Sequence, residues 1–200
     1  MLEIKNLYFD YPNQSVLKDL SISVKPGMLL HLRGENGSGK TTLMKIVAGL
    51  LYPESGDVFC NGHSVKTNVS QYQSQLSFVG HKPGLSLLLT IKENCLYGLD
   101  ILPLNKSLDD ILHQFGLQGL ENTPCHLLSA GQLRRAGLMK LALSSSPLWL
   151  LDEPMVSLDV PSIQLLITCM REHLENKGMI MMTSHQLVPL PNIDFKEYCL

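Results

Sequence analysis

A glycine-rich run at residues 34–41 constrains the fold more than any other feature of this chain. It reads Gly-Glu-Asn-Gly-Ser-Gly-Lys-Thr and satisfies the pattern GxxxxGK[ST]. The run follows an apolar stretch at 28–32 that is typical of a β-strand, and it leads into residues 41–50, whose apolar positions recur at helical spacing. A strand, a glycine loop and a helix in this order let backbone N–H groups turn around a phosphate. The sequence therefore predicts an α/β fold with a phosphate-binding loop at 34–41, here called the P-loop.

The P-loop residues are expected to divide the work of holding a nucleotide. Lys40 brings a positive charge to the β- and γ-phosphates, and Thr41 offers a hydroxyl to Mg²⁺. The glycines let the backbone turn inward around the phosphates. The residues expected to bind the nucleotide in this segment are Gly34, Glu35, Asn36, Gly37, Ser38, Gly39, Lys40, Thr41 and Thr42.

Two adjacent carboxylates follow a second apolar stretch, at 148–151. This stretch and a similar one at 179–182 predict strands of a parallel sheet, which places Asp152 and Glu153 at its carboxyl edge. Asp152 is expected to hold the hydration shell of Mg²⁺, and Glu153 to orient the attacking water as a general base. Two solvated acids that merely cap a strand are the alternative, and the P-loop in the same chain makes it the weaker interpretation.

Composition excludes several classes of protein. The chain has 16 Lys and Arg against 18 Asp and Glu, a net charge of −2 and no basic run, which argues against nucleic-acid binding. Its longest apolar runs fall far short of the ~18 to 20 residues of a membrane span. Five widely separated cysteines, an odd number, indicate a reduced chain. The N-terminus carries no basic leader, so no secretory signal is expected, and any membrane contact is expected to come through a partner.

The 200 residues predict one domain with an inserted helical part. The first thirty residues alternate apolar and polar positions, as short β-strands do. The Leu-rich stretch from about 84 to 146 has few β-branched residues and is interrupted by prolines and glycines, which predicts several helices. We therefore expect a core at 1–83 and 147–200 and a helical subdomain at about 84–146.

A third motif, Leu-Ser-Ala-Gly-Gln at 128–132, resembles the LSGGQ signature of ATP-binding cassette (ABC) ATPases. The resemblance covers nearly the whole chain, because Asp159 in Ser-Leu-Asp looks like the family's D-loop and His185 looks like its switch histidine, a γ-phosphate contact. Tyr11 stands where the family places an aromatic ring that stacks on adenine, although an aromatic in such a strand is also commonly core. The resemblance implies ATP and Mg²⁺, ATP hydrolysis, and a P-loop NTPase fold of the ABC type with an N-terminal antiparallel β-part.

The same resemblance implies partners. In this family two chains hold two ATP molecules head to tail, so the signature residues Ser129, Ala130, Gly131 and Gln132 are expected to face ATP bound by a second copy. Ser129 is also a good helix N-cap, and the N–H groups after it could receive an anion. Integral membrane subunits are expected on separate chains, docking on the leucine-rich segment at 81–96.

Two departures from the family pattern narrow the resemblance. His81 stands where most ABC proteins carry a glutamine that touches Mg²⁺, and a neutral imidazole can still offer a nitrogen to water or metal. Ala130 replaces the first glycine of the signature. With Gly-His-Lys-Pro-Gly-Leu at 80–85, these features look similar to the ATP-binding subunits of cytochrome c maturation systems.

That closer resemblance implies a peripheral ATPase at the cytoplasmic face of the inner membrane, which drives haem export or the release of a haem-loaded chaperone. No direct haem contact is expected, because the chain has no CxxCH motif. An ATPase subunit of another small-molecule exporter or importer is the main alternative. The missing basic surface disfavours an ABC ATPase that acts on DNA or ribosomes, and the signature disfavours a small-molecule kinase.

Overall fold

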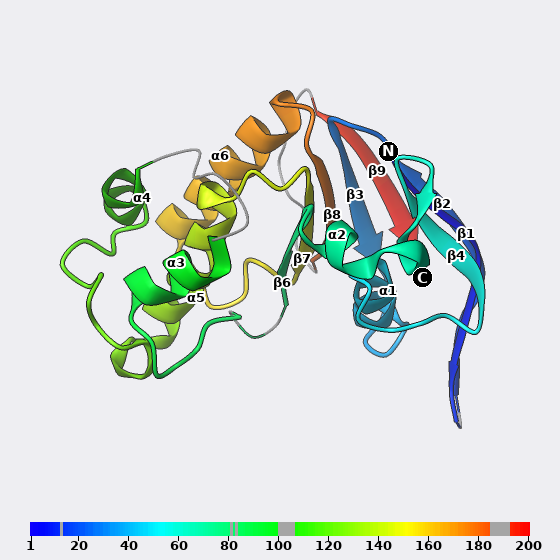
Figure 1. Ribbon diagram of the computed structural model, residues 1–200, viewed down its shortest axis with the longest axis horizontal. Coiled ribbons are helices and arrows are strands. Elements are labelled where there is room, and N and C mark those ends of the chain that lie inside the picture. Colours follow the sequence, from blue (N-terminus) through cyan, green and yellow to red (C-terminus); the bar gives the residue numbers. More distant parts are fainter. Residues whose placement is uncertain (13, 81, 83, 100–106, 185–192) are drawn as a thin grey trace.

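Two β-sheets and the helices around them make up the protein (Figure 1). The computed structural model describes residues 1–12, 14–80, 82, 84–99, 107–184 and 193–200. In Figure 1 an antiparallel sheet lies at one end, a group of helices lies at the other, and a parallel sheet stands between them. None of the helices within the described ranges is long and apolar enough to cross a membrane.

The antiparallel sheet contains four strands in the order β2-β1-β4-β5. Its strands are β1 (Leu2–Tyr11), β2 (Gln14–Val24), β4 (Ser55–Cys60) and β5 (His63–Ser64). Apolar and polar residues alternate along the first part of β1, and its inward side chains join those of β2 in a core shared with the parallel sheet. One sheet face is therefore buried, and the other carries the polar residues.

The parallel sheet has the order β6-β7-β8-β3-β9, and every neighbouring pair is parallel. Its strands are β3 (Met28–Arg33), β6 (Leu76–Val79), β7 (Leu148–Asp152), β8 (Met179–Thr183) and β9 (Asp194–Cys199). β7 and β8 are buried throughout, as expected for a parallel sheet covered on both faces. All strands end at the same edge, where the P-loop and the acids also lie.

Helices cover both faces of the parallel sheet. The first is α1 (Lys40–Val47), which packs in the core that the two sheets share. The longest is α6 (Val160–Glu175), which packs in the second core together with α5 (Ala130–Leu143). The remaining helices are η1 (Val65–Thr67), α2 (Val69–Gln73), α3 (Ile91–Leu99), α4 (Leu108–Gln114) and η2 (Cys125–Leu127).

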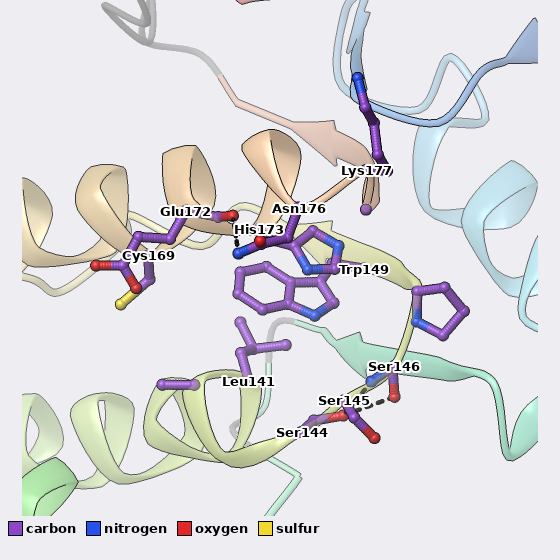
Figure 2. Close-up of a pocket in the computed structure, with 13 residues that line it drawn as sticks. Leu141, Ser144, Ser145, Ser146, Trp149, Cys169, Glu172, His173, Asn176 and Lys177 are labelled. Carbon is purple, nitrogen blue, oxygen red and sulfur yellow. Dashed lines mark hydrogen bonds between the residues drawn. The ribbon is translucent and has the colours of Figure 1, made fainter. Parts of the chain in front are cut away.

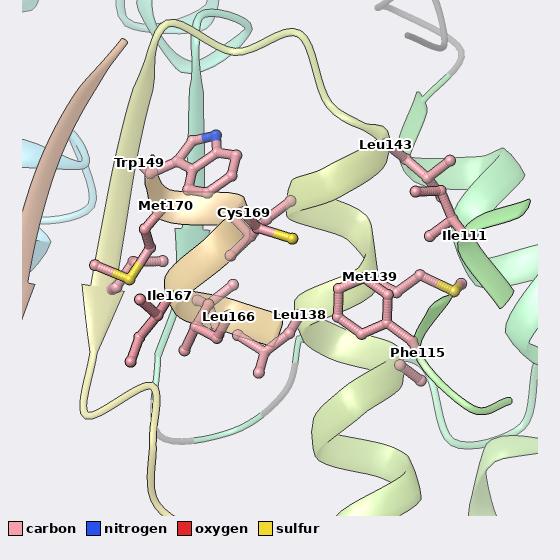
Figure 3. Packing of buried hydrophobic residues seen from close by; sticks show 14 of the residues in the cluster. Ile111, Phe115, Leu138, Met139, Leu143, Trp149, Leu166, Ile167, Cys169 and Met170 are labelled. Atoms are coloured by element: carbon pink, nitrogen blue, oxygen red, sulfur yellow. The ribbon is translucent and has the colours of Figure 1, made fainter. Parts of the chain in front are cut away.

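α3, α4 and α5 follow one another between β6 and β7, in the stretch where the sequence predicts a helical subdomain. In the described part of this region the buried side chains share one core with α6, and Figure 3 shows Leu138 of α5 beside Leu166 and Ile167 of α6, with Met139 next to Phe115. Burial of each such side chain contributes roughly 1.5 to 3 kcal/mol. The helix that begins at the signature is thus packed onto the layer that supports β7. The exact subdomain bounds stay a prediction.

A pocket of about 500 Å³ lies at the opposite edge of the sheet from the P-loop, between the ends of α5 and α6 and the start of β7 (Figure 2). Its floor is a stacked pair, with the rings of Trp149 and His173 4.0 Å apart and only 11° from parallel. Burial lowers the pKa of His173 from 6.5 to about 4, because desolvation disfavours the imidazolium. The folded protein therefore holds this histidine neutral in mild acid.

We expect the stability of the protein to fall in mild acid because of His173. Below pH 6.5 the unfolded chain protonates this residue while the folded chain does not until about pH 4, so protons favour unfolding. Between neutral pH and pH 5 the loss is about 2 kcal/mol. Urea unfolding at both pH values measures it, with His173→Phe as the matched variant that keeps a ring against Trp149. An equal acid loss in His173→Phe would assign the effect to other groups.

Candidate functional site

The P-loop joins the end of β3 to α1 with a backbone that requires glycine at two positions. Gly39 is the N-cap of α1 with φ +101°, and a Cβ there would lie 2.6 Å from Val16 Cγ1. Gly34 has φ +144°, and its Cβ would lie 2.7 Å from the carbonyl oxygen of Leu200. At both positions, therefore, a side chain would be disfavoured by the positive φ and would also clash with neighbouring atoms. The loop closes tightly around the N-terminus of α1, where backbone N–H groups favour an anion.

Lys40 lies over the P-loop. Its Nζ donates to the carbonyl oxygens of Gly34, at 2.9 Å, and Glu35, at 2.7 Å. An ammonium has three donors, so a phosphate oxygen can be bound without breaking either contact. The positive charge is thus fixed beside the N-terminus of α1, which carries a partial positive charge of its own.

Asp152 is the centre of a hydrogen-bond network at the sheet edge. It ends β7, is only 2% exposed, and accepts from Thr41 Oγ1 at 2.9 Å on one carboxylate oxygen. Thr183 Oγ1 donates to the other oxygen at 2.7 Å. Thr183 ends β8 and lies directly beside Asp152 in the parallel register. The network therefore fixes the carboxylate between the P-loop and the neighbouring strand.

Glu153 follows Asp152 with an unusual backbone conformation. Its φ is +49°, a left-handed value that costs a residue other than glycine roughly 1 kcal/mol or more. Three hydrogen bonds hold its backbone there: its N–H donates to Thr183 Oγ1 at 2.9 Å, and its carbonyl oxygen accepts from Arg134 Nη2 at 2.7 Å and from the N–H of Val156 at 3.3 Å. Both acids line the same pocket.

A pocket of about 360 Å³ joins the P-loop to these acids. Tyr11, at the end of β1, is 44% exposed and packs edge-to-face on Phe9 with ring centroids 5.0 Å apart. It also lines the pocket, so its ring can reach a planar base. The described lining residues are Tyr11, Val16, Asn36, Gly37, Gly39, Lys40, Thr41, Thr42, Asp152 and Glu153.

The signature residues stand apart from the described lining of this pocket. Ser129 caps α5 with a reciprocal pair, since its Oγ accepts from the N–H of Gln132 at 3.2 Å and its own N–H donates to Gln132 Oε1 at 2.9 Å. Ser129 and Ala130 are exposed. A Cβ on Gly131 would lie 3.8 Å from the carbonyl oxygen of Ser157, so the signature adjoins the D-loop segment. The capped N-terminus of α5 is therefore exposed.

Asp159 is the N-cap of α6, and its Oδ1 accepts from the N–H of Ser162 at 3.0 Å. Hydrogen bonds from the side chain and then the backbone of Ser162 lower the pKa of the Asp159 carboxyl. The two histidines that are expected in the site, His81 and His185, lie outside the described residues. Their roles stay predictions.

Comparison with known proteins places the chain in a family. The "ABC transporter" family model matches residues 17–156. A protein from Legionella pneumophila (strain Lens), described as "Cytochrome c biogenesis ATP-binding export protein CcmA", is 45% identical over 200 residues, which is 100% of both chains. The chain belongs to the CcmA family of ABC transporter proteins. It therefore binds nucleotide and is an ATPase.

Solved structures agree with this membership. A structure described as the ATP-binding subunit of an ABC transporter matches with a TM-score of 0.85 and 28% identity, over 92% of this chain and 80% of that one. An ATP-binding cassette solved as a dimer in a post-hydrolysis state with ADP and Pi has the same fold, with a TM-score of 0.81 and 22% identity over 93% of this chain and 88% of the other. The predicted ABC-type α/β fold is confirmed.

Within this CcmA-family fold, the structure brings most of the predicted residues together and adds two that the sequence did not predict. Tyr11, the P-loop, Asp152 and Glu153 share one pocket. Thr183 and Arg134 are the additions, because they hold Asp152 and Glu153 in place. A polar residue at the end of β8 could have marked Thr183, whereas Arg134 sits among ordinary helix residues and carries no such signal.

Proposed function

We propose that this protein is the ATP-hydrolysing subunit of a membrane complex that serves cytochrome c maturation, by exporting haem or by releasing a haem-loaded chaperone. The observation that carries the proposal is the identity of 45% over the whole length of a protein described as a cytochrome c biogenesis ATP-binding export protein. The assignment of haem to this complex is supported by the sequence motifs at 80–85 and 128–132, which resemble those of the ATP-binding subunits of such systems.

Magnesium fits the oxygen donors of the site. Thr41 Oγ1 and Asp152 Oδ2 lie 2.9 Å apart, and hydroxyl and carboxylate oxygens are ligands that Mg²⁺ accepts while it keeps several waters. Thr41 and Asp152 would hold the ion, directly or through water, and His81 would be a further contact. When bound, Mg²⁺ would neutralise charge on the phosphates.

The remaining chemistry falls to side chains. Lys40 stabilises the charge of the transferred γ-phosphate, and Glu153 accepts a proton from the attacking water as a general base. Tyr11 stacks on adenine at the far end of the pocket. His185 contacts the γ-phosphate. Because the P-loop and the acids line one pocket, the water can be held in line with the bond that breaks.

The signature completes the site of a second copy. Support comes from its placement, since Ser129 and Ala130 are exposed at the N-terminus of α5 and stand apart from the described lining of their own pocket. The 14-residue helix is long enough for its N-terminus to favour a phosphate. We therefore expect two chains to bind head to tail, with Gly131 and Gln132 at the γ-phosphate of the partner's ATP and Asp159 near the junction.

Integral membrane subunits on separate chains would dock at the leucine-rich segment before α3. Leu87 is 51% exposed and Leu88 is 83% exposed, which a turn with only a packing role does not require. A short apolar helix of a membrane subunit fits such a surface. Docking would hold this protein peripherally at the cytoplasmic face of the inner membrane, with no nucleic acid and no haem bound by this chain itself.

Replacement of Lys40 by Ala tests the proposed function. The change removes the phosphate-binding charge, so c-type cytochromes should lose their covalent haem. The host is a bacterium that lacks its own homologous subunit and carries this chain, and the readout is haem staining of membrane proteins on denaturing gels. We expect c-type bands only with the parental chain, and unchanged b-type haem in both strains.

Lys45→Ala is the matched control, because Lys45 belongs to the same helix but to its last turn. It should restore the c-type bands. Normal c-type bands with Lys40→Ala would contradict the cytochrome c assignment and leave an ATPase subunit of another exporter or importer.

A further inference from the structure

Arg134 is a buried arginine in the second turn of α5, just beyond the signature. The residue is only 4% exposed. Its two terminal nitrogens donate to backbone carbonyls from two other segments, Nη1 to Gly80 at 2.8 Å and Nη2 to Glu153 at 2.7 Å. A guanidinium is a planar fork whose donors keep a fixed separation, so the two carbonyls are fixed relative to each other and to the helix.

The two carbonyls belong to the working edge of the sheet. Gly80 directly follows β6, and Glu153 directly follows β7. β6 and β7 are neighbouring parallel strands in which Val79 pairs with Leu151, so both carbonyls emerge at the same edge. One of them belongs to the residue assigned as general base, and the other precedes His81 in the chain. Arg134 therefore connects three segments that lie far apart in sequence.

The positive charge of Arg134 is electrostatically complementary to the two acids at the end of β7. Burial lowers the pKa of the Arg134 guanidinium, and the nearby carboxylates of Asp152 and Glu153 offset part of that lowering. An arginine side chain keeps its proton under such opposing effects. A buried positive charge beside two acids offsets part of their mutual repulsion, and an apolar residue in its place would leave two carbonyls without this donor.

We propose that Arg134 is a positioning residue that fixes the backbone of Glu153 to the signature helix, so that a displacement of that helix moves the general base. The N–H of Glu153 donates to Thr183 Oγ1 at 2.9 Å, and within the turn after β7 its carbonyl oxygen also accepts a longer hydrogen bond, of 3.3 Å, from the N–H of Val156. Glu153 is thus held between β8 on one side and α5 on the other, at a left-handed φ that needs such support. This role of Arg134 rests on the proposed role of Glu153 as the general base and does not depend on what the complex transports.

Two variants distinguish the effect of the paired guanidinium donors from the effect of the positive charge. Arg134→Lys keeps the positive charge and the apolar stem but loses the planar pair of donors, whereas Arg134→Met loses both. Because displacement of a catalytic group by about 1 Å can cost about 10²-fold in rate, we expect a fall in kcat of about 10-fold for Arg134→Lys and about 10²-fold for Arg134→Met. The affinity for ATP and the number of ATP molecules bound per chain should stay within about 2-fold of the parent.

Turnover is measured on the full-length chain in the complex in which it purifies, and is expressed per ATP-binding site so that unfolded chains do not count. Lys140→Met is the matched control, since it removes a positive charge from the last turn of the same helix. It should leave kcat unchanged. If Arg134→Met does not fold, the kcat of Arg134→Lys is by itself sufficient to test the proposal.

A second background tests whether Arg134 acts through Glu153. Combined with Glu153→Gln, the Arg134→Lys change should lower the residual turnover by less than about 2-fold, because residues that act as a unit are not additive. An equal loss in both backgrounds would assign Arg134 a general structural role. A parental kcat in Arg134→Lys, or a loss confined to ATP affinity, would equally overturn the proposal.

Discussion

Glu153→Gln is expected to stop ATP turnover almost completely while ATP still binds. The amide cannot accept a proton from the attacking water, and loss of a general base costs about 10² to 10⁴ in rate. The backbone contacts of residue 153, from Thr183 and Arg134, do not involve its carboxylate and persist in the variant. Lys40, Thr41 and Asp152 still hold the nucleotide. Phosphate release by the assembled protein and equilibrium binding of a fluorescent ATP analogue measure the two effects separately.

Glu175→Gln is the matched control, because Glu175 lies at the end of α6 and is exposed. It should retain parental turnover. If Glu153→Gln hydrolysed ATP at the parental rate, the general base would have to be another group. If it instead lost ATP affinity, Glu153 would be a binding residue rather than a catalytic one.

The parts of the fold that the sequence predicted are those whose signals are local. The order of strand, glycine loop and helix around residues 34–41 is contained in one short segment, and the glycines there are required by positive φ and close approach. The apolar stretches at 148–151 and 179–182 are buried strands of a parallel sheet, as their composition indicates. The amino-acid sequence alone was therefore enough to place Asp152 and Glu153 at the sheet edge.

The contacts that hold the acids could not be predicted in the same way. Thr183 reaches Asp152 across a strand pair separated by 31 positions in sequence, and Arg134 reaches Gly80 across 54 positions. Such contacts depend on strand order and on the packing of α5 against the sheet, which no local pattern encodes. The same holds for β9, whose Cys199 pairs with Arg33 beside the P-loop although residues 194–199 predict no particular neighbour.

Ser129→Arg is expected to abolish ATP hydrolysis by the assembled protein and to spare ATP binding by the isolated chain. Ser129 is exposed and stands apart from the described lining of its own pocket, so a bulky cation there leaves that pocket intact. In a head-to-tail dimer the same side chain would project into the partner's γ-phosphate site. Loss of the N-cap costs about 1 kcal/mol, which a folded chain tolerates.

The Glu153→Gln background makes the test direct, because a variant that binds ATP without hydrolysing it should accumulate the closed dimer. Size-exclusion chromatography with ATP should show a dimer for Glu153→Gln and a monomer once Ser129→Arg is added. Ser107→Arg is the matched control, since Ser107 is an exposed N-cap of α4 in the same helical region, and it should leave the dimer intact. A weaker affinity for ATP in the isolated Ser129→Arg monomer would contradict the composite site, because it would mean that the signature completes the pocket of its own chain.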